Sequence, residues 1–200
     1  MRYDPVDGVS AAFSPSFMPR VPALGPVVVA LLACVATTGA VAQEPGNEDR
    51  LKAAFTYQFA QFVDWPEAAW DDLKQVEFCV VASAPLGREL EQFVRGESLR
   101  GRPLAIRELG PEDAVDTCQI LVLTARSNRA AGELLKQAST RPILTIGDSE
   151  GFLDAGGIIR LKVVDRRVRF DVDVAHARRA GLRISSQLLN LARSIRGGPS

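Results

Sequence analysis

Side chains that could support catalysis are few in this chain. His176 is the single histidine, and so the one side chain whose ordinary pKa suits a general base near neutral pH. A serine-histidine-aspartate set would need Ser185 or Ser186 in a nucleophile setting, which the surrounding sequence does not provide. Because His176 stands between two alanines near the start of an expected helix, we expect it to face solvent without a catalytic role.

The sequence also lacks the patterns of metal and nucleotide sites. A single histidine and the lack of a C-x-x-C pair exclude the common multi-ligand transition-metal patterns. The stretch from Gly147 to Gly157 is rich in glycine, but it matches neither a phosphate-binding loop nor a dinucleotide fingerprint. We therefore interpret it as a turn and predict no metal and no cofactor.

Two carboxylate pairs complete the chemical inventory. Asp71 and Asp72 fall in an expected loop. Asp171 and Asp173 fall on one side of an expected strand, where we expect solvent or a neighbour such as Arg169 to neutralise them. Neither pair has a partner group that would make it a general acid and base, so we predict that the protein is not an enzyme.

The N-terminal region has the features of a signal peptide. From Met18 to Ala42 it contains one early positive charge, at Arg20, and an unbroken apolar run, Val27 to Val35. Ala40 to Ala42 forms a small-x-small cleavage site, which predicts cleavage before Gln43. Residues 1–42 are thus expected to be an extension and signal, and residues 43–200 a single secreted α/β domain.

Other interpretations of this region stay open. Asp4 and Asp7 precede the apolar run and suit a signal badly, so Met18 is the expected true start. The residues up to Cys34 resemble a lipoprotein box, although the small-x-small site lies further along. An uncleaved anchor is disfavoured, because a span takes about 20 predominantly apolar residues.

Removal of the signal would leave two cysteines, Cys79 and Cys118, in an oxidising compartment. An even pair in a secreted chain favours a disulfide. Each cysteine lies at or near the start of an apolar, strand-like run, so the alternative is two separate buried thiols.

Charge is balanced overall but unevenly distributed. Residues 43–156 include 12 basic and 19 acidic side chains, whereas residues 157–200 include 10 basic and 3 acidic ones. Overall neutrality argues against a nucleic-acid partner. The basic C-terminal part is either an ordinary solvated surface or a docking face for an acidic partner or for membrane headgroups.

The first expected element of the domain is a helix that ends near Asp64. Leu51, Phe55, Phe59 and Phe62 recur at helical spacing, which predicts one buried apolar stripe. Pro66 then disfavours helical geometry in the residue before it.

Strand-like and helical patterns alternate after this helix, and two strands joined by a turn at Asp165 and Arg166 close the sheet. One long C-terminal helix is expected from Ala175 to about Ile195, weakened at Gly181. The pattern predicts an α/β fold, a three-layer-like sandwich with a mixed, mainly parallel sheet, helices near both ends and a late β-hairpin. The remaining expected elements are strands at 75–82, 99–109, 118–123, 142–146, 158–164 and 168–174, and helices from 84 and at 130–138.

Three segments together resemble the YfiR family of periplasmic proteins, whose best-known members repress an inner-membrane diguanylate cyclase. They are KAAFTYQFAQFVDWP (52–66), ILTIGDSEGFLDAGGIIRL (143–161) and RVRFDVDVAHARRAGLRISSQLLNLA (167–192). Cys79 and Cys118 also fall where many members place a cysteine pair. A second, later pair found in the repressor-type member has no counterpart, because no cysteine follows Cys118.

This resemblance implies a non-enzymatic regulator located in the periplasm, which binds the periplasmic domain of an inner-membrane diguanylate cyclase or sensor kinase as a homodimer. The alternative is a receptor for a small-molecule ligand, with a pocket lined by Tyr57 and Trp65. The partner surface is expected on the C-terminal strand and helix, with Ile184 and Leu188 as packing supports. Its candidate contacts are Arg166, Arg167, Arg178, Arg179 and Arg183.

Overall fold

The computed structural model describes residues 45–198, apart from 82, 111 and 126–127. The expected signal peptide, its alternatives and the start at Met18 lie outside these residues. In the described part of the chain, no helix is both long and apolar enough to cross a membrane.

The first helix, α1 (Pro45–Gln61), ends earlier than the sequence predicted. Val63–Asp64 forms a short strand, β1, which pairs antiparallel with β9 (Arg183–Ile184) and so takes the backbone out of the helix. The expected buried stripe was only partly right, because Phe59 is buried while its other three members are half-exposed. The buried face of α1 consists of Ala53, Thr56, Phe59 and Ala60.

An eight-stranded sheet forms the centre of the domain, in the order β10-β8-β7-β6-β5-β2-β4-β3. Every neighbouring pair is parallel except β7 with β8 and β3 with β4. The predicted mixed, mainly parallel sheet is therefore confirmed. Its first six strands in chain order are β2 (Val76–Val81), β3 (Ser98–Leu99), β4 (Arg102–Leu109), β5 (Cys118–Leu123), β6 (Leu144–Gly147) and β7 (Ile159–Val164). The last two are β8 (Arg167–Asp173) and β10 (Ser194–Arg196).

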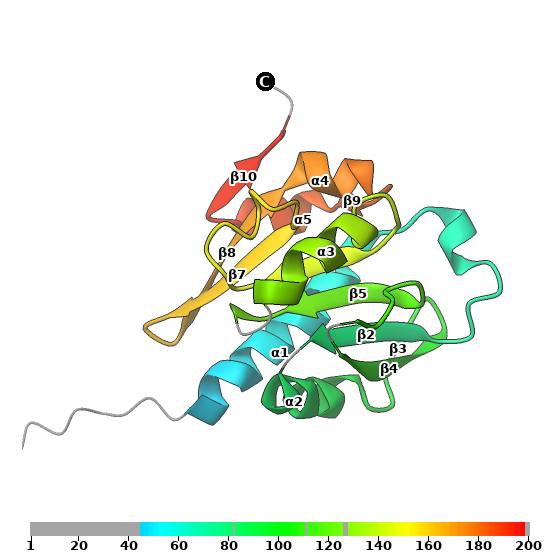
Figure 1. Ribbon diagram of the computed structural model, residues 1–200, viewed down its shortest axis with the longest axis horizontal. Helices are drawn as coiled ribbons and strands as arrows, with labels where there is room; N and C mark the ends of the chain where they lie inside the picture. The colour runs from blue at the N-terminus through cyan, green and yellow to red at the C-terminus, as the bar shows by residue number, and fades with distance from the viewer. Residues whose placement is uncertain (1–44, 82, 111, 126–127, 199–200) are drawn as a thin grey trace, which may run out of the picture. The chain divides into compact units, whose positions relative to one another are not determined.

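Helices cover both faces of this sheet, as the predicted sandwich requires (Figure 1). One face packs against α1 and α2 (Ala84–Val94), and the rings of Phe59 and Phe170 lie 4.8 Å apart there. The other face packs against α3 (Asn128–Ala138), through Leu134 and Leu135. Two apolar cores result, one on each side of the central strands.

The parallel strands reverse their order of addition between β2 and β5. From β2 the chain passes through α2 to β4 on one side, and from β5 through α3 to β6 on the other. In open α/β sheets such a reversal leaves a crevice at the carboxyl ends of the strands, which is a common place for ligands.

The late hairpin formed as predicted. Asp165 and Arg166 both adopt left-handed backbone conformations, with φ of 51° and 56°. A two-residue turn of this kind matches the right-handed twist of the strands that it joins, β7 and β8. Figure 1 shows the tip of this hairpin projecting from the domain, away from the C-terminal helices.

The single long C-terminal helix was a wrong prediction. Two short helices, α4 (Val174–Arg179) and α5 (Ser186–Leu191), lie on either side of β9, and β10 follows them. Gly181 adopts a left-handed φ of 74°, which ends α4 because other residues avoid this conformation. Separate N-caps start the two helices, since Asp173 accepts from the amide of His176 and Ser185 from that of Leu188.

A consequence of this break is an exposed apolar end of the chain. Leu191 and Ile195 were expected on the buried face of one helix, but their exposed fractions are 74% and 48%. Between them the chain leaves α5 and enters β10, an edge strand of which all three residues are exposed.

Candidate functional site

The predicted disulfide joins two neighbouring central strands. Cys79 of β2 and Cys118 of β5 are bonded, with their Cα atoms 5.8 Å apart. Both residues are almost completely buried beneath α3, in the same core as Leu121 and Leu134. Reductants therefore reach the bond only when this part of the domain opens.

The expected solvent-facing position of His176 was wrong. Its ring is half-buried, and Nδ1 lies 2.9 Å from the carbonyl oxygen of Gly157, to which it donates. Asp173 lies beside it, but this carboxylate accepts the amide of His176 and caps α4. Ser185 caps α5 in the same way, so these side chains serve helix ends rather than a nucleophile.

A metal site is not formed by the residues that the structure describes. No group of three or more histidine, cysteine, aspartate or glutamate side chains lies close enough to hold an ion among them. Asp71 and Asp72 are exposed, as expected for a loop.

The other carboxylate pair is buried rather than solvated, and Asp171 is neutralised by neighbouring arginines. Asp171 is 3% exposed and binds Arg160 and Arg193 at 2.6 Å each, with Ser194 donating to it as well. Arg169, the partner that the sequence suggested, is not among these contacts. The hydrogen bond from Arg193 and those from Ser194 and Arg160 lower the pKa of Asp171 although burial opposes this, so the carboxylate stays charged. This cluster fastens β10 to β8 and β7.

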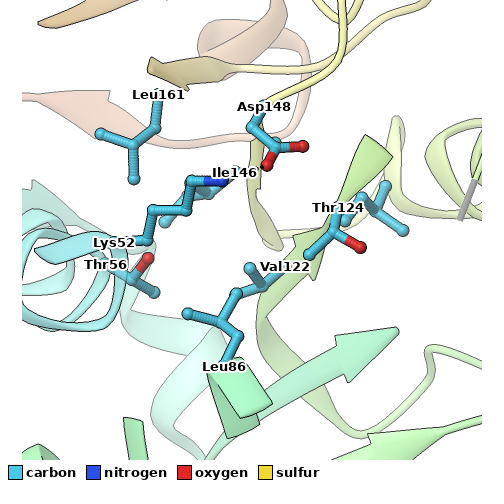
Figure 2. Close-up of a pocket in the computed structure, with 10 residues that line it drawn as sticks. Lys52, Thr56, Leu86, Val122, Thr124, Ile146, Asp148 and Leu161 are labelled. Atoms are coloured by element: carbon cyan, nitrogen blue, oxygen red, sulfur yellow. Dashed lines mark hydrogen bonds and ion pairs between the residues drawn. The ribbon is translucent and has the colours of Figure 1, made fainter. Parts of the chain in front are cut away.

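A narrow pocket lies at the carboxyl ends of β5 and β6, beside the reversal of strand order (Figure 2). Lys52 and Thr56 reach it from α1, and Asp148 from the turn after β6. The space is enough for about one water molecule. The other lining residues are Leu86, Val122, Leu123, Thr124, Ile146, Gly147 and Leu161.

Charge at this pocket is carried by an ion-pair network. Lys52 Nζ lies 2.6 Å from Asp148 and 2.7 Å from Glu48, and Asp148 also accepts the amide of Ala125. Burial on its own would lower the pKa of Lys52, but hydrogen bonds to Asp148 and Glu48 reverse this, and the pKa lies above its ordinary value. Lys52 is therefore a charged ammonium rather than a nucleophilic amine.

Thr56 is the unusual polar group of the pocket. The residue is 1% exposed, and its hydroxyl oxygen has no hydrogen-bond partner among the described residues. A buried hydroxyl without a partner costs free energy, so a water molecule or a small polar ligand group would be favourable beside it.

A second small pocket lies between α3 and α4. His176 and Arg179 line it on one side, and Ser139 and Thr145 on the other. The hydroxyl of Thr145 already accepts the amide of Ile158, so it is satisfied within the protein.

The two aromatic residues proposed for a pocket are engaged with other parts of the domain. Trp65 is 4% exposed, and its indole nitrogen donates to the carbonyl of Pro142 at 2.9 Å. Tyr57 is half-buried, and its hydroxyl donates to Glu97 at 3.1 Å. Burial and then the hydrogen bond to Glu97 raise the pKa of this phenol. Tyr57 and Trp65 line neither pocket.

The five arginines proposed for partner binding are all exposed, and they form two groups. Arg166 and Arg167 lie at the tip of the β7–β8 hairpin, whereas Arg178, Arg179 and Arg183 lie on α4 and β9. The seven residues of β8 separate the groups by about 20 Å.

Sequence reasoning missed two basic residues that share a face with the first group. Lys162 lies directly opposite Arg169 in the hairpin, and Val164 opposite Arg167, all on the side away from α1. The strict alternation in RVRFDVD was the signal that could have found Arg169, because it places Arg167, Arg169 and Asp171 on one face. Lys162 could then have been found from the expected hairpin, which pairs it with Arg169 across the turn.

Comparison with known families gives a clear result. Residues 49–193 match the model of the YfiR/HmsC-like family. The chain belongs to this family. The match covers every described strand and helix from α2 to α5, and the resemblance noted in the sequence is confirmed.

Comparison with solved structures finds a protein of similar fold. The YfiR/HmsC-like chain is similar to a conserved domain protein from Vibrio cholerae O1 biovar El Tor str. N16961, with 10% identity and a TM-score of 0.50. The alignment covers 72% of this chain and 60% of that structure, so the chain spans less than two thirds of its length. This likeness concerns the fold alone. None of the curated proteins matches the sequence.

Membership carries a coarse functional statement. The best-known members of the YfiR/HmsC-like family are periplasmic regulators of diguanylate cyclase signalling, and the match relates this chain to such a role at the level of the family alone.

Proposed function

We propose that this protein is a non-enzymatic periplasmic regulator that binds the periplasmic domain of an inner-membrane diguanylate cyclase and holds the enzyme inactive. The observation that carries the proposal is the family match over residues 49–193, which spans nearly the whole described domain. A sensor kinase with a similar periplasmic domain is the alternative partner. The protein would act after removal of its leader, as a homodimer.

The state of the reactive side chains is consistent with binding rather than chemistry. Lys52 is held as an ammonium between two carboxylates, and Asp171 is held as a carboxylate between two arginines. His176 is engaged with a backbone carbonyl. Each group is satisfied by other parts of the same domain.

A partner-binding surface is best supported in the basic C-terminal part of the domain. Its two arginine groups are about 20 Å apart, whereas an interface of common size buries about 800 Å² on each partner and is about 30 Å across. One partner could therefore contact both groups. Repression further requires that the cyclase bind more tightly in its inactive state than in its active one.

A pull-down tests the proposal. The tagged protein, purified from cells that express the full chain, would be incubated with solubilised inner membranes, and the captured proteins identified by mass spectrometry. We expect recovery of a membrane protein with a cyclase domain, which tag-only bait does not recover. Recovery of no signalling protein in repeated captures would contradict the proposal. Co-expression with the recovered cyclase should then lower the cellular level of cyclic di-GMP.

A small-molecule receptor is the second candidate, and the unpartnered hydroxyl of Thr56 is the observation in its favour. Because the pocket has room for about one water molecule, a metabolite would have to open it. A rise in melting temperature with a fractionated cell extract, lost in Thr56→Val, would support this function.

A further inference from the structure

Two positive charges face each other across the exposed side of the β7–β8 hairpin. Lys162 of β7 and Arg169 of β8 are direct register partners. Residues in this relationship have Cβ atoms about 5 Å apart, and like charges there destabilise an antiparallel pair. The apolar packing of the hairpin does not need them, because its buried side chains, including Leu161 and Phe170, lie on the opposite face.

Carboxylates of the domain neutralise only one end of this face. Arg160 binds the buried Asp171, and Lys162 reaches the exposed Glu150 at 3.0 Å. Toward the tip, Arg167 and Arg169 are exposed and have no carboxylate within 4 Å among the described residues. The turn also contains the exposed Asp165, so the tip, with Arg166, Arg167 and Arg169, has a net positive charge that no ion pair within 4 Å neutralises among the described residues.

An exposed apolar side chain accompanies these charges. Val164 is 52% exposed, and it lies opposite Arg167 and on the same face as Lys162. The buried centre of a protein interface is more apolar than the rest of the surface, and arginine is enriched in interfaces, where it provides directed hydrogen bonds.

We propose that the exposed face formed by Lys162, Val164, Arg167 and Arg169 docks onto an acidic surface of a partner protein. The guanidinium groups would bind carboxylates of the partner in paired hydrogen bonds, and Val164 would pack between them. The partner's carboxylates would also relieve the repulsion between Lys162 and Arg169. The inference rests on the proposed function, because it assumes that the partner is a protein. It restricts the contact surface to the hairpin and excludes the arginines of α4 and β9.

The small number of basic side chains without an ion pair at the hairpin tip favours a protein as the partner over a membrane surface. After the ion pairs of Lys162 and Arg160 are set aside, the tip carries Arg166, Arg167 and Arg169 together with Asp165, which is three positive charges and one negative. Recruitment to anionic lipid typically uses clusters of about four to eight basic residues. Three arginines on a fixed strand pair suit discrete carboxylates better.

Charge reversal with a matched control tests the contact. The variant is Arg167→Glu with Arg169→Glu, and the control is Arg178→Glu with Arg179→Glu, which makes the same charge change on α4. The probe is a short peptide of alternating glutamate and glycine, and binding is followed by NMR shifts in the protein purified from cells that express the full chain. We expect wild-type shifts centred on residues 160–169. The hairpin variant should bind at least about tenfold more weakly, and the control should change less than about threefold.

The remaining outcomes separate this inference from the proposed function. Equal loss in both variants would overturn the inference, since it would indicate a general charge effect. So would the absence of peptide binding, or binding to phosphatidylglycerol vesicles without binding to the peptide. In the pull-down, a cyclase retained by the hairpin variant would overturn the inference but leave the function intact. Peptide binding at the hairpin without recovery of a cyclase would support the docking surface but contradict the proposed function.

Stability gives an independent measure of the same contact. Arg169→Glu places opposite charges across from each other, so it should raise the melting temperature by about 1–3 °C while it weakens peptide binding. A fall in melting temperature together with weaker binding would show that Arg169 supports the fold, and would overturn the inference.

Discussion

Lys52 Nζ lies 2.6 Å from the carboxylate of Asp148, and this ion pair joins α1 to the turn that follows β6. The two side chains are 13% and 16% exposed, so the pair is shielded from water on most sides. Asp148 also accepts the amide of Ala125, just after β5. Three segments that are distant in sequence thus meet at one carboxylate.

Removal of either partner should destabilise the domain. We expect Lys52→Met and Asp148→Asn each to lower the free energy of unfolding by about 2 kcal/mol, because each leaves the other side chain poorly paired in a shielded site. The double variant should lose less than the sum of the two. Urea denaturation of all four proteins gives the coupling energy, and a value near zero would show that the pair does not stabilise the fold.

The lowered pKa of Asp171 leads us to expect a loss of stability in acid. The hydrogen bond from Arg193 and its other contacts lower the pKa of this carboxyl, so in acid the unfolded chain takes up the proton first. The stabilisation is complete above the unfolded pKa of about 3.9 and is lost as the pH falls below it. Asp171→Asn should lower the free energy of unfolding by about 2 kcal/mol at pH 7.

Unfolding curves from pH 6 to pH 2 check this sign. The difference between wild type and Asp171→Asn should stay constant down to about pH 5 and then shrink as the pH falls further. Asp116→Asn is a suitable control, because Asp116 forms a more exposed ion pair with Arg141. A difference that stays constant with pH would contradict the assignment.

The central α/β part of the fold could be predicted from sequence because local signals agreed there. Apolar runs of strand length, Pro85 at the start of α2 and the two-residue turn at Asp165 and Arg166 all indicate the observed structure. The C-terminal region was predicted wrongly because Ala177, Ile184, Leu188 and similar residues also fit helical spacing. Periodicity alone does not reveal caps at Asp173 and Ser185.

The candidate sites were less predictable, because they depend on contacts between distant segments. The pairing of Lys52 with Asp148 spans 96 positions, and nothing local to either residue indicates it. The glycines at 147 and 157 were interpreted as parts of a plain turn. In the structure the ring of Phe152 packs directly on both, where a β-carbon would overlap it. Only tertiary packing explains that requirement.

The buried disulfide should stabilise the domain without acting as a redox switch. Its closed loop has a sequence separation of 39 residues, for which the chain-entropy model gives about 4 kcal/mol. We expect Cys79→Ala with Cys118→Ala to lower the free energy of unfolding by about 3 kcal/mol. Mild reductant should leave the native protein oxidised, and partner capture unchanged. Thiol labelling with and without urea distinguishes a buried structural disulfide from an accessible redox switch. Rapid labelling of the native protein after mild reductant would contradict the prediction.

Gly181 gives the sharpest test of why the C-terminal helix is broken. Its φ is 74°, and a β-carbon added there would make only an ordinary contact with Pro66, at 3.8 Å. The cost of Gly181→Ala should therefore come from the backbone alone, at about 1 kcal/mol. Gly132→Ala is the matched control, because Gly132 is exposed within α3 and has open space beside it. That variant should instead be more stable by up to about 1 kcal/mol. If both substitutions stabilised the protein in thermal unfolding, the left-handed turn would not be what ends α4, and one continuous helix would again be a possible structure for this segment.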